Sequence, residues 1–195
     1  MGQIILVTGA ARSGKSSFAE ALAASSGKEI TYFATAQADD AEMAERIRRH
    51  RASRPSSWPT IEEPLDVPAR LADLLNCDRV VLLDCLTLWL SNLLLQQLDA
   101  QGELLPGFQQ KIEQQVTKLV EIAQRGPATL ICVSNEVGWS VVPENKLARV
   151  YRDLTGRANQ AVARAAGKVY LVVAGYPLEI KASGSKIRAE IGVEP

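Results

Sequence analysis

The sequence predicts an α/β fold with a mainly parallel sheet flanked by helices. Apolar runs of strand length recur at residues 4–7, 30–34, 80–83, 129–133 and 169–173. Several of these runs lack polar alternation, which is typical of strands that are covered on both faces. Helix-prone segments lie between them, and this alternation indicates parallel strands joined by right-handed crossovers.

The first apolar run leads directly into Gly9-Ala10-Ala11-Arg12-Ser13-Gly14-Lys15-Ser16 and then into a helix-prone segment. The spacing G-x-x-x-x-G-K-[ST] between a strand and a helix is that of the phosphate-binding loop (P-loop) of nucleoside triphosphate enzymes. Its glycines permit backbone angles that a side chain would obstruct, and its N–H groups face a polyanion. We expect Lys15 to neutralise the β- and γ-phosphates and the Ser16 hydroxyl to ligate Mg²⁺.

The apolar run at 80–83 ends in Asp84. In P-loop enzymes an aspartate in this position holds Mg²⁺ directly or through water, so we expect Asp84 in the metal shell. Thr87 is interpreted as the cap of the following helix. Ligands of parallel sheets bind at the carboxyl ends of the strands. Ser134-Asn135-Glu136-Val137-Gly138-Trp139 follows another run and places polar groups there, for function or as an ordinary turn.

Phe108, Ile112, Val116, Leu119 and Ala123 recur at helical spacing and predict an amphipathic helix that ends near Gly126-Pro127. A second stripe of apolar residues spans 147–165 and predicts another helix of the same kind. Residues 53–68 are interrupted by prolines and are expected to form an active-site loop, whereas residues 97–106 are expected to form an exposed turn.

His50, the only histidine of the chain, lies in the arginine-rich helical segment 42–55. A neutral imidazole can attack phosphorus and form a phosphoramidate. Arg48, Arg49 and Arg51 would disfavour the protonated ring by like-charge repulsion, and arginines also suit phosphate oxygens. A lone histidine at a helix end is usually structural, however, and the residues alone leave that alternative open.

Length and composition limit the class of protein. The 195 residues suit one α/β domain spanning residues 1–195, and the 22 basic and 22 acidic side chains give no net charge that would favour nucleic acid or an anionic membrane. Cys77, Cys85 and Cys132 are widely spaced and are interpreted as reduced thiols. The leucine-rich stretch 86–95 contains polar residues and is too short to span a membrane. We expect a cytoplasmic protein.

The chain resembles the bifunctional adenosylcobinamide kinase/adenosylcobinamide-phosphate guanylyltransferase family of cobalamin synthesis. The resemblance covers nearly the whole chain. Its motifs are GAARSGKS at 9–16, FATAQADDAEMAERIRRHRASRP at 33–55, WPTIEEPLD at 58–66, LLDCLTLWLSNLL at 82–94, SNEVGWSVVPENKLARVYRDLTGRANQAVA at 134–163 and VYLVVAGYPLEIK at 169–181. The departures are small: Ala10 and Ser140 stand where glycine is common in the family.

The resemblance implies a P-loop NTPase fold with a RecA-like sheet, and two reactions. The hydroxyl of adenosylcobinamide receives a phosphoryl group from ATP or GTP, and adenosylcobinamide phosphate then receives GMP from GTP through a guanylylated histidine, here His50. The implied catalytic residues are His50 and Lys15, and Mg²⁺ would be held by Ser16 and Asp84. The implied nucleotide site comprises residues 9–16 with Ala34, Thr35, Ala36, Arg51, Ala52, Ser53, Arg54, Glu62 and Asp84. The resemblance also implies a homotrimer or a related homo-oligomer.

Two other functions fit parts of the pattern. A monofunctional P-loop kinase acting on another alcohol would need Lys15, Ser16 and Asp84 but not His50. A nucleotide-dependent regulatory module would bind a triphosphate, hydrolyse it slowly and have no small-molecule acceptor. The histidine–arginine segment and the near-complete resemblance favour the bifunctional enzyme over both.

Overall fold

The computed structural model describes residues 2–37, 41–52 and 54–193. It contains a seven-stranded sheet with the strand order β3-β2-β4-β5-β1-β6-β7. The strands are β1 Gln3–Gly9, β2 Ile30–Ala34, β3 Thr60–Glu62, β4 Val80–Asp84, β5 Thr129–Val133, β6 Lys168–Val173 and β7 Tyr176–Glu179. The pairs from β3 through to β6 are parallel, and β6 pairs with β7 in the antiparallel direction. The predicted mainly parallel sheet is confirmed.

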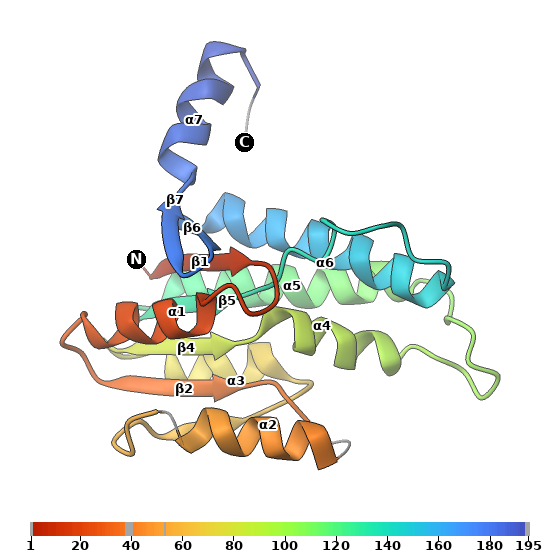
Figure 1. Cartoon of the computed structure of the whole chain (residues 1–195), viewed down its shortest axis with the longest axis horizontal. Helices are drawn as coiled ribbons and strands as arrows, with labels where there is room; N and C mark the ends of the chain where they lie inside the picture. The colour runs from red at the N-terminus through yellow and green to blue at the C-terminus, as the bar shows by residue number, and fades with distance from the viewer. Residues whose placement is uncertain (1, 38–40, 53, 194–195) are drawn as a thin grey trace.

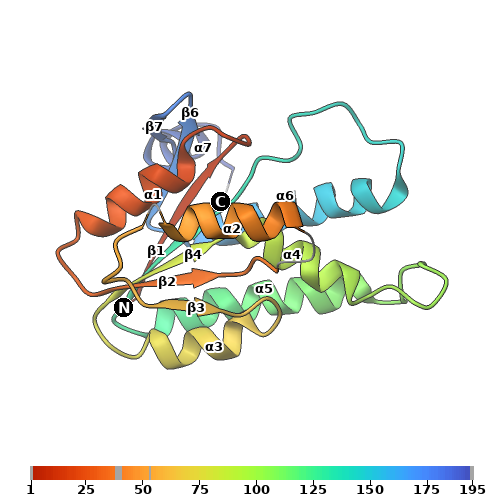
Figure 2. The same ribbon diagram turned by 60° about the horizontal axis from the view of Figure 1, so that its bottom comes forward.

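The helices are α1 Lys15–Ala24, α2 Ala41–Ala52, α3 Val67–Leu74, α4 Leu86–Leu95, α5 Phe108–Arg125, α6 Lys146–Ala165 and α7 Lys181–Glu190. Helices α3 to α6 contribute to the hydrophobic cluster on one face of the sheet, while α1 packs on the other face (Figure 2). Helix α2 lies alongside the β2 side of the sheet (Figure 1). Because both faces are covered, the central strands need apolar residues at every position.

Strand β1 shows this two-sided burial directly. Ile4 and Leu6 belong to the cluster beneath α3 to α6, whereas Ile5 and Val7 belong to the cluster beneath α1. Successive side chains of a strand point to opposite faces, so an unbroken apolar run supplies both cores. The predicted stripe of α5 is likewise buried at Ile112, Val116, Leu119 and Ala123.

The structure corrects two sequence-based expectations and confirms a third. The segment 53–68, expected as a loop, contains β3 and the start of α3; the N–H of Tyr32 donates to the Pro59 carbonyl (2.9 Å), which leads the chain into pairing with β2. Cys85, not Thr87, caps α4, because its sulfur accepts the N–H of Leu88. The three cysteines are free thiols, as expected.

None of the helices in the described part of the chain is both long and apolar enough to cross a membrane. Leu86–Leu95, the leucine-rich segment, is instead α4, which packs its buried residues into the core beneath the sheet.

Substitution of Trp89 on α4 measures how much this core contributes to the stability of the fold. Its side chain is fully buried and its indole N–H donates to the Leu65 carbonyl at 2.9 Å. We expect Trp89→Ala to lower the free energy of unfolding by about 3–5 kcal/mol, because it leaves a large cavity and an unpaired carbonyl. Leu95 on the same helix is 52% exposed, so Leu95→Ala should change the same free energy by less than about 0.5 kcal/mol. Urea denaturation followed by circular dichroism measures both; similar losses in the two variants would contradict this account of the core.

Candidate active site

The P-loop joins β1 to α1, as the motif predicts. Gly9 and Gly14 have φ angles of +156° and +92°, which side chains disfavour. A Cβ atom at Gly9 would lie 2.4 Å from the Val172 carbonyl oxygen, and one at Gly14 would lie 3.1 Å from the Cα of Gly175. The strand β6 and the turn after it therefore press against the loop, and glycine is required at both positions.

The charged and hydroxyl groups of the loop gather at the start of α1. The Lys15 side chain is buried, and its ammonium donates to the Ala10 carbonyl at 3.2 Å, so it lies back over the loop. Ser13 Oγ is a buried polar atom without a hydrogen-bond partner in the described structure. The first turn of a helix also directs backbone N–H groups outward from its end. This arrangement suits the oxygens of a polyphosphate.

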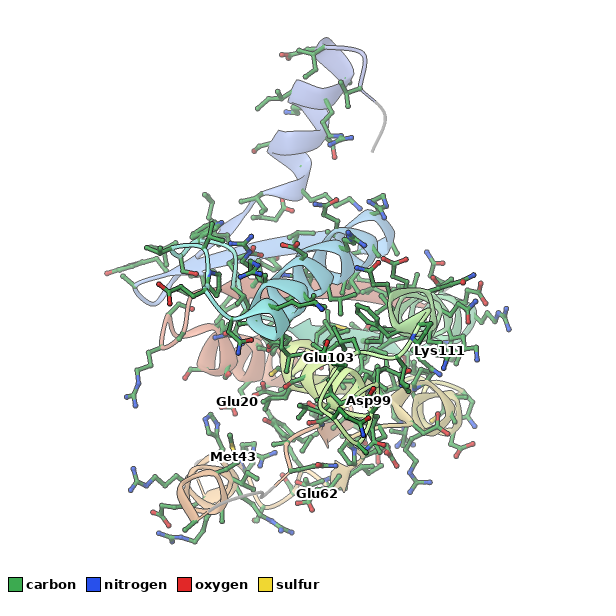
Figure 3. The ribbon with its side chains drawn as sticks, turned by 90° about the vertical axis from the view of Figure 1, so that its right-hand side faces the viewer. Glu20, Met43, Glu62, Asp99, Glu103 and Lys111 are labelled. Atoms are coloured by element: carbon green, nitrogen blue, oxygen red, sulfur yellow. The ribbon has the colours of Figure 1, made fainter. Side chains whose placement is uncertain are left out.

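A cavity of about 540 Å³ opens beside the loop at the carboxyl edge of the sheet. It runs from the P-loop past β5 and β4 to β2 and β3, and α2 closes one side. Its lining comprises Ala11, Arg12, Lys15, Ser16, Tyr32, Ala34, Ala36, Met43, Ile47, His50, Arg54, Glu62, Asp84, Cys85, Thr87, Leu88, Asn135, Glu136, Val137 and Tyr151. Figure 3 faces this edge, with Met43 of α2 and Glu62 of β3 below Glu20 of α1. The predicted position of the ligand at this edge coincides with the cavity.

Asp84 belongs to a charged cluster in the middle of the cavity. The Tyr32 hydroxyl donates to Asp84 Oδ2 at 2.8 Å, which fixes the carboxylate. Burial, reinforced by the negative charge of Asp84, raises the pKa of Tyr32, so the phenol remains a donor across the physiological range. The carboxylate of Asp84 and the hydroxyl of Ser16 both line the cavity, and both offer the hard oxygen ligands that Mg²⁺ prefers.

Arg54 links this cluster to α2. Its guanidinium carbon lies 3.4 Å from the centroid of the Tyr32 ring, which is a cation–π contact, and its Nε donates to the His50 carbonyl at 2.8 Å. Arg54 Nη1 is buried and has no hydrogen-bond partner in the described structure. A buried guanidinium N–H without an acceptor is costly, and an anionic ligand in the cavity would satisfy it.

His50 lines the same cavity from the last turn of α2. Its arginine neighbours Arg48 and Arg49 point elsewhere: both pair with Glu45, at 2.7 Å and 2.8 Å, on the exposed face of the helix. These two guanidiniums are therefore surface ion pairs, the ordinary alternative for an arginine-rich helix. Helix α2 thus presents its single imidazole to the cavity and part of its positive charge to solvent.

The residues expected in the nucleotide site fall into three groups. Ala11, Arg12, Lys15, Ser16, Ala34, Ala36, Arg54, Glu62 and Asp84 line the cavity, whereas Gly9, Ala10, Ser13, Gly14, Thr35, Arg51 and Ala52 do not. Thr35 is buried and bonded to the backbone of Cys85 through its hydroxyl, and Arg51 and Ala52 are exposed. Ser53 lies outside the described residues. The roles assigned to all of these residues stay predictions.

Sequence reasoning missed two side chains at this edge of the sheet. Glu20 of α1 is half-buried, and its pKa is raised. Burial is the largest cause; the positive charge of Arg54 lowers the pKa and the negative charge of Asp84 raises it, so Glu20 interacts electrostatically with both residues. Tyr151 of α6 lines the cavity, and its hydroxyl donates to the Thr87 carbonyl at 3.1 Å. Each is a single polar residue within a helix, and only the tertiary packing reveals which way it points.

The loop and the sheet together define the P-loop fold of RecA-like proteins. A solved ATPase of the type III secretion system of pathogenic bacteria shares this fold, with a TM-score of 0.50 and 12% identity over 88% of this chain and 52% of that chain. A likeness of this size concerns the fold alone.

The particular family follows from sequence comparison. The model of the cobinamide kinase / cobinamide phosphate guanyltransferase family (CobU) matches residues 5–180. The bifunctional adenosylcobalamin biosynthesis protein CobP of Pseudomonas aeruginosa is 46% identical over 90% of this chain and 96% of that protein. CobU of Escherichia coli K12, which bears the same description, is 44% identical over 91% of this chain and 99% of that protein. The chain belongs to this family, whose activities are those of a bifunctional cobinamide kinase and cobinamide phosphate guanylyltransferase in adenosylcobalamin biosynthesis.

Proposed function

We propose that the chain phosphorylates adenosylcobinamide with ATP or GTP, and then transfers GMP from GTP to adenosylcobinamide phosphate through a guanylylated His50. The product of the second reaction is adenosylcobinamide-GDP. The observation that carries the proposal is that His50 and Lys15 line one cavity. A triphosphate bound at the P-loop can therefore extend towards the imidazole without leaving the pocket.

The dimensions of the sheet support this arrangement. Neighbouring strands lie about 4.8 Å apart, so β1 and β3, which are four steps apart in the strand order, are separated by roughly 19 Å. The P-loop follows β1, and Glu62 ends β3 at the opposite end of the cavity. An extended nucleoside triphosphate fits this span. Glu62 can accept two N–H groups from a guanine base there, and the phosphates remain at Lys15.

Guanylyl transfer then proceeds in two displacements. His50 attacks the α-phosphorus, a nitrogen–phosphorus bond forms, and the bond to the bridging oxygen breaks to release pyrophosphate. A phosphate oxygen of adenosylcobinamide phosphate next attacks the phosphoramidate and restores the imidazole. The covalent carrier replaces the direct attack of one anion on another. Arg54, with its unpartnered buried Nη1, is suited to hold a phosphate oxygen during both steps.

Phosphoryl transfer depends mainly on positioning and charge stabilisation. Lys15 is suited to the β- and γ-phosphates, and Ser16 with Asp84 would hold Mg²⁺ beside them. Mg²⁺ commonly uses one or two protein ligands together with substrate phosphates, and a serine hydroxyl with a carboxylate fits that pattern. When bound, the ion neutralises charge that develops on the triphosphate.

We also propose a homo-oligomer, such as a homotrimer. Helix α7 projects from the rest of the molecule and none of its residues is buried (Figure 1). Ile187 and Ile191 of this region and Tyr176 and Leu178 of β7 are exposed. Exposed apolar residues on a projecting segment favour burial against another copy of the chain. Light scattering of the purified protein gives the subunit number.

Covalent labelling tests the proposed function. We expect GTP labelled at the α-phosphate to leave an acid-labile, alkali-stable label on the protein, because a phosphoramidate has that stability. GTP labelled at the γ-phosphate should leave none, and His50→Ala should not be labelled by either nucleotide. Absence of label from α-labelled GTP, under conditions in which the protein demonstrably binds the nucleotide, would contradict the intermediate and favour a plain kinase.

A further inference from the structure

Glu136 is joined to the P-loop by its backbone. Strand β5 pairs with β1 in parallel, and the pairing continues past its end: the Ser134 N–H donates to the Val7 carbonyl at 2.9 Å. The Glu136 N–H donates to the carbonyl of Gly9, the first residue of the P-loop, at 3.1 Å. The carboxylate of Glu136 is thereby carried beside the phosphate-binding loop, on the segment that follows β5.

The side chain of Glu136 is held in one orientation. The Thr8 hydroxyl donates to Glu136 Oε1 at 2.7 Å, and the Asn159 amide donates to the same oxygen at 3.3 Å. Asn159 is itself fixed, because it accepts the Ser134 hydroxyl and donates to the Asn135 carbonyl. Both donors reach Oε1, and Glu136 lines the cavity. Oε2 is therefore the carboxylate oxygen that can serve a substrate.

The other carboxylates that line the cavity are less well placed for the γ-phosphate. Asp84 ends β4, two strands from β1, and accepts the Tyr32 hydroxyl. Glu62 ends β3, roughly 19 Å from β1 by strand spacing. Glu136 follows β5, which is the immediate neighbour of β1, so its backbone lies roughly 5 Å from that of the loop strand. Among these three residues it is the one beside the loop.

We propose that Glu136 is the general base of the kinase reaction, accepting the proton of the cobinamide alcohol. The alcohol oxygen bonds to the γ-phosphorus while its proton passes to the Glu136 carboxylate. The bond between the γ-phosphorus and the β–γ bridging oxygen breaks, and the nucleoside diphosphate leaves. This inference rests on the triphosphate lying in the P-loop, as in the proposed function.

Guanylyl transfer makes no such demand. Its two nucleophiles are an imidazole nitrogen and a phosphate oxygen, and both present a lone pair without first losing a proton. An alcohol is a poor nucleophile while it keeps its proton, so a positioned base accelerates only the kinase reaction. Assaying both activities in one variant therefore distinguishes a role of Glu136 as kinase base from a general loss of function.

The test is Glu136→Gln, assayed in both half-reactions. The glutamine carbonyl can still accept the Thr8 hydroxyl, so a purely structural role would be preserved. We expect the kcat of cobinamide phosphorylation to fall by about 10²-fold or more with little change in the KM for ATP. Guanylyl transfer to supplied cobinamide phosphate should stay within about threefold of the wild type. Kinase kcat within threefold of the wild type, or a parallel loss of both activities, would overturn the assignment.

Two further variants keep the result decisive. Glu144 lies in the same connection between β5 and α6, is exposed and does not line the cavity, so Glu144→Gln should leave both activities unchanged. Glu136→Asp keeps the negative charge and serves as the second variant if Glu136→Gln fails to bind nucleotide. A lowered ratio of kinase activity to guanylyl-transfer activity in Glu136→Asp would then support the assignment. An unchanged ratio would overturn it. Loss of nucleotide binding in Lys15→Ala, measured separately, tests the P-loop site itself.

Discussion

His50→Ala is expected to lower guanylyl transfer by at least about 10³-fold while cobinamide phosphorylation stays within about threefold. Removal of a covalent nucleophile leaves the reaction without its two-step route, and such losses are large. Phosphorylation places no demand on the imidazole, because the alcohol attacks the γ-phosphorus directly. Assays of each half-reaction, with cobinamide or with preformed cobinamide phosphate as acceptor, measure the two effects independently.

Arg48→Ala is the matched control for His50→Ala. Arg48 lies on the same helix, but its guanidinium pairs with Glu45 on the exposed face and does not line the cavity. Both activities should persist in this variant, since an exposed ion pair contributes little to stability. Equal loss of both half-reactions in a folded His50→Ala protein would count against a division of labour between His50 and the P-loop.

The central part of the fold was predictable because its signals are local. The strand β1, the glycine-bounded loop and α1 follow one another within the first 24 residues, and each is specified by its own short pattern. The buried parallel strands β4 and β5 were also predictable, since strands covered on both faces are uninterrupted apolar runs. The carboxyl edge of such a sheet then locates the cavity.

Other elements depend on contacts between distant segments. Strand β3 has three residues, Thr60–Glu62, and exists because it pairs with β2; strand β7 exists through its pairing with β6. The cap of α4 was assigned to Thr87 on its residue type, yet the Cys85 sulfur fills that role while Thr87 accepts the Asn135 amide. Neither these short strands nor the cap can be predicted from a local sequence pattern, because tertiary packing determines both.

The same limit applies to the arginine-rich segment of α2. The sequence shows that Glu45 and Arg49 are four residues apart, and so indicates a surface pair between them, but it does not show which side of the helix faces the sheet. Arg54 follows the helix and turns inward onto the ring of Tyr32, whereas Arg51 remains exposed. The sequence therefore singled out the segment as a candidate, and the fold separates the side chains that reach the cavity from those that reach solvent.

Lys15→Ala is expected to lower both activities by about 10²-fold or more. The Lys15 side chain is buried in the P-loop. In the proposed complex its removal leaves the phosphate charge without its buried partner, and such a loss costs about 3–5 kcal/mol. If ATP and GTP use this loop in turn, the same loss must appear in phosphoryl transfer and in guanylylation of His50. Lys28→Ala is the control, because Lys28 precedes β2 at the opposite edge of the sheet and pairs with Asp78.

The pattern of loss in Lys15→Ala distinguishes two arrangements of the enzyme. With a single nucleotide site, kinase activity and α-phosphate labelling fall together, and ATP competes with GTP for labelling of the wild-type protein. A folded Lys15→Ala variant that loses only kinase activity would mean that GTP reaches His50 from elsewhere. The geometry favours the single site, because one cavity of about 540 Å³ is lined by both Lys15 and His50. Guanylylation and phosphorylation should then be mutually exclusive on any one subunit at any moment.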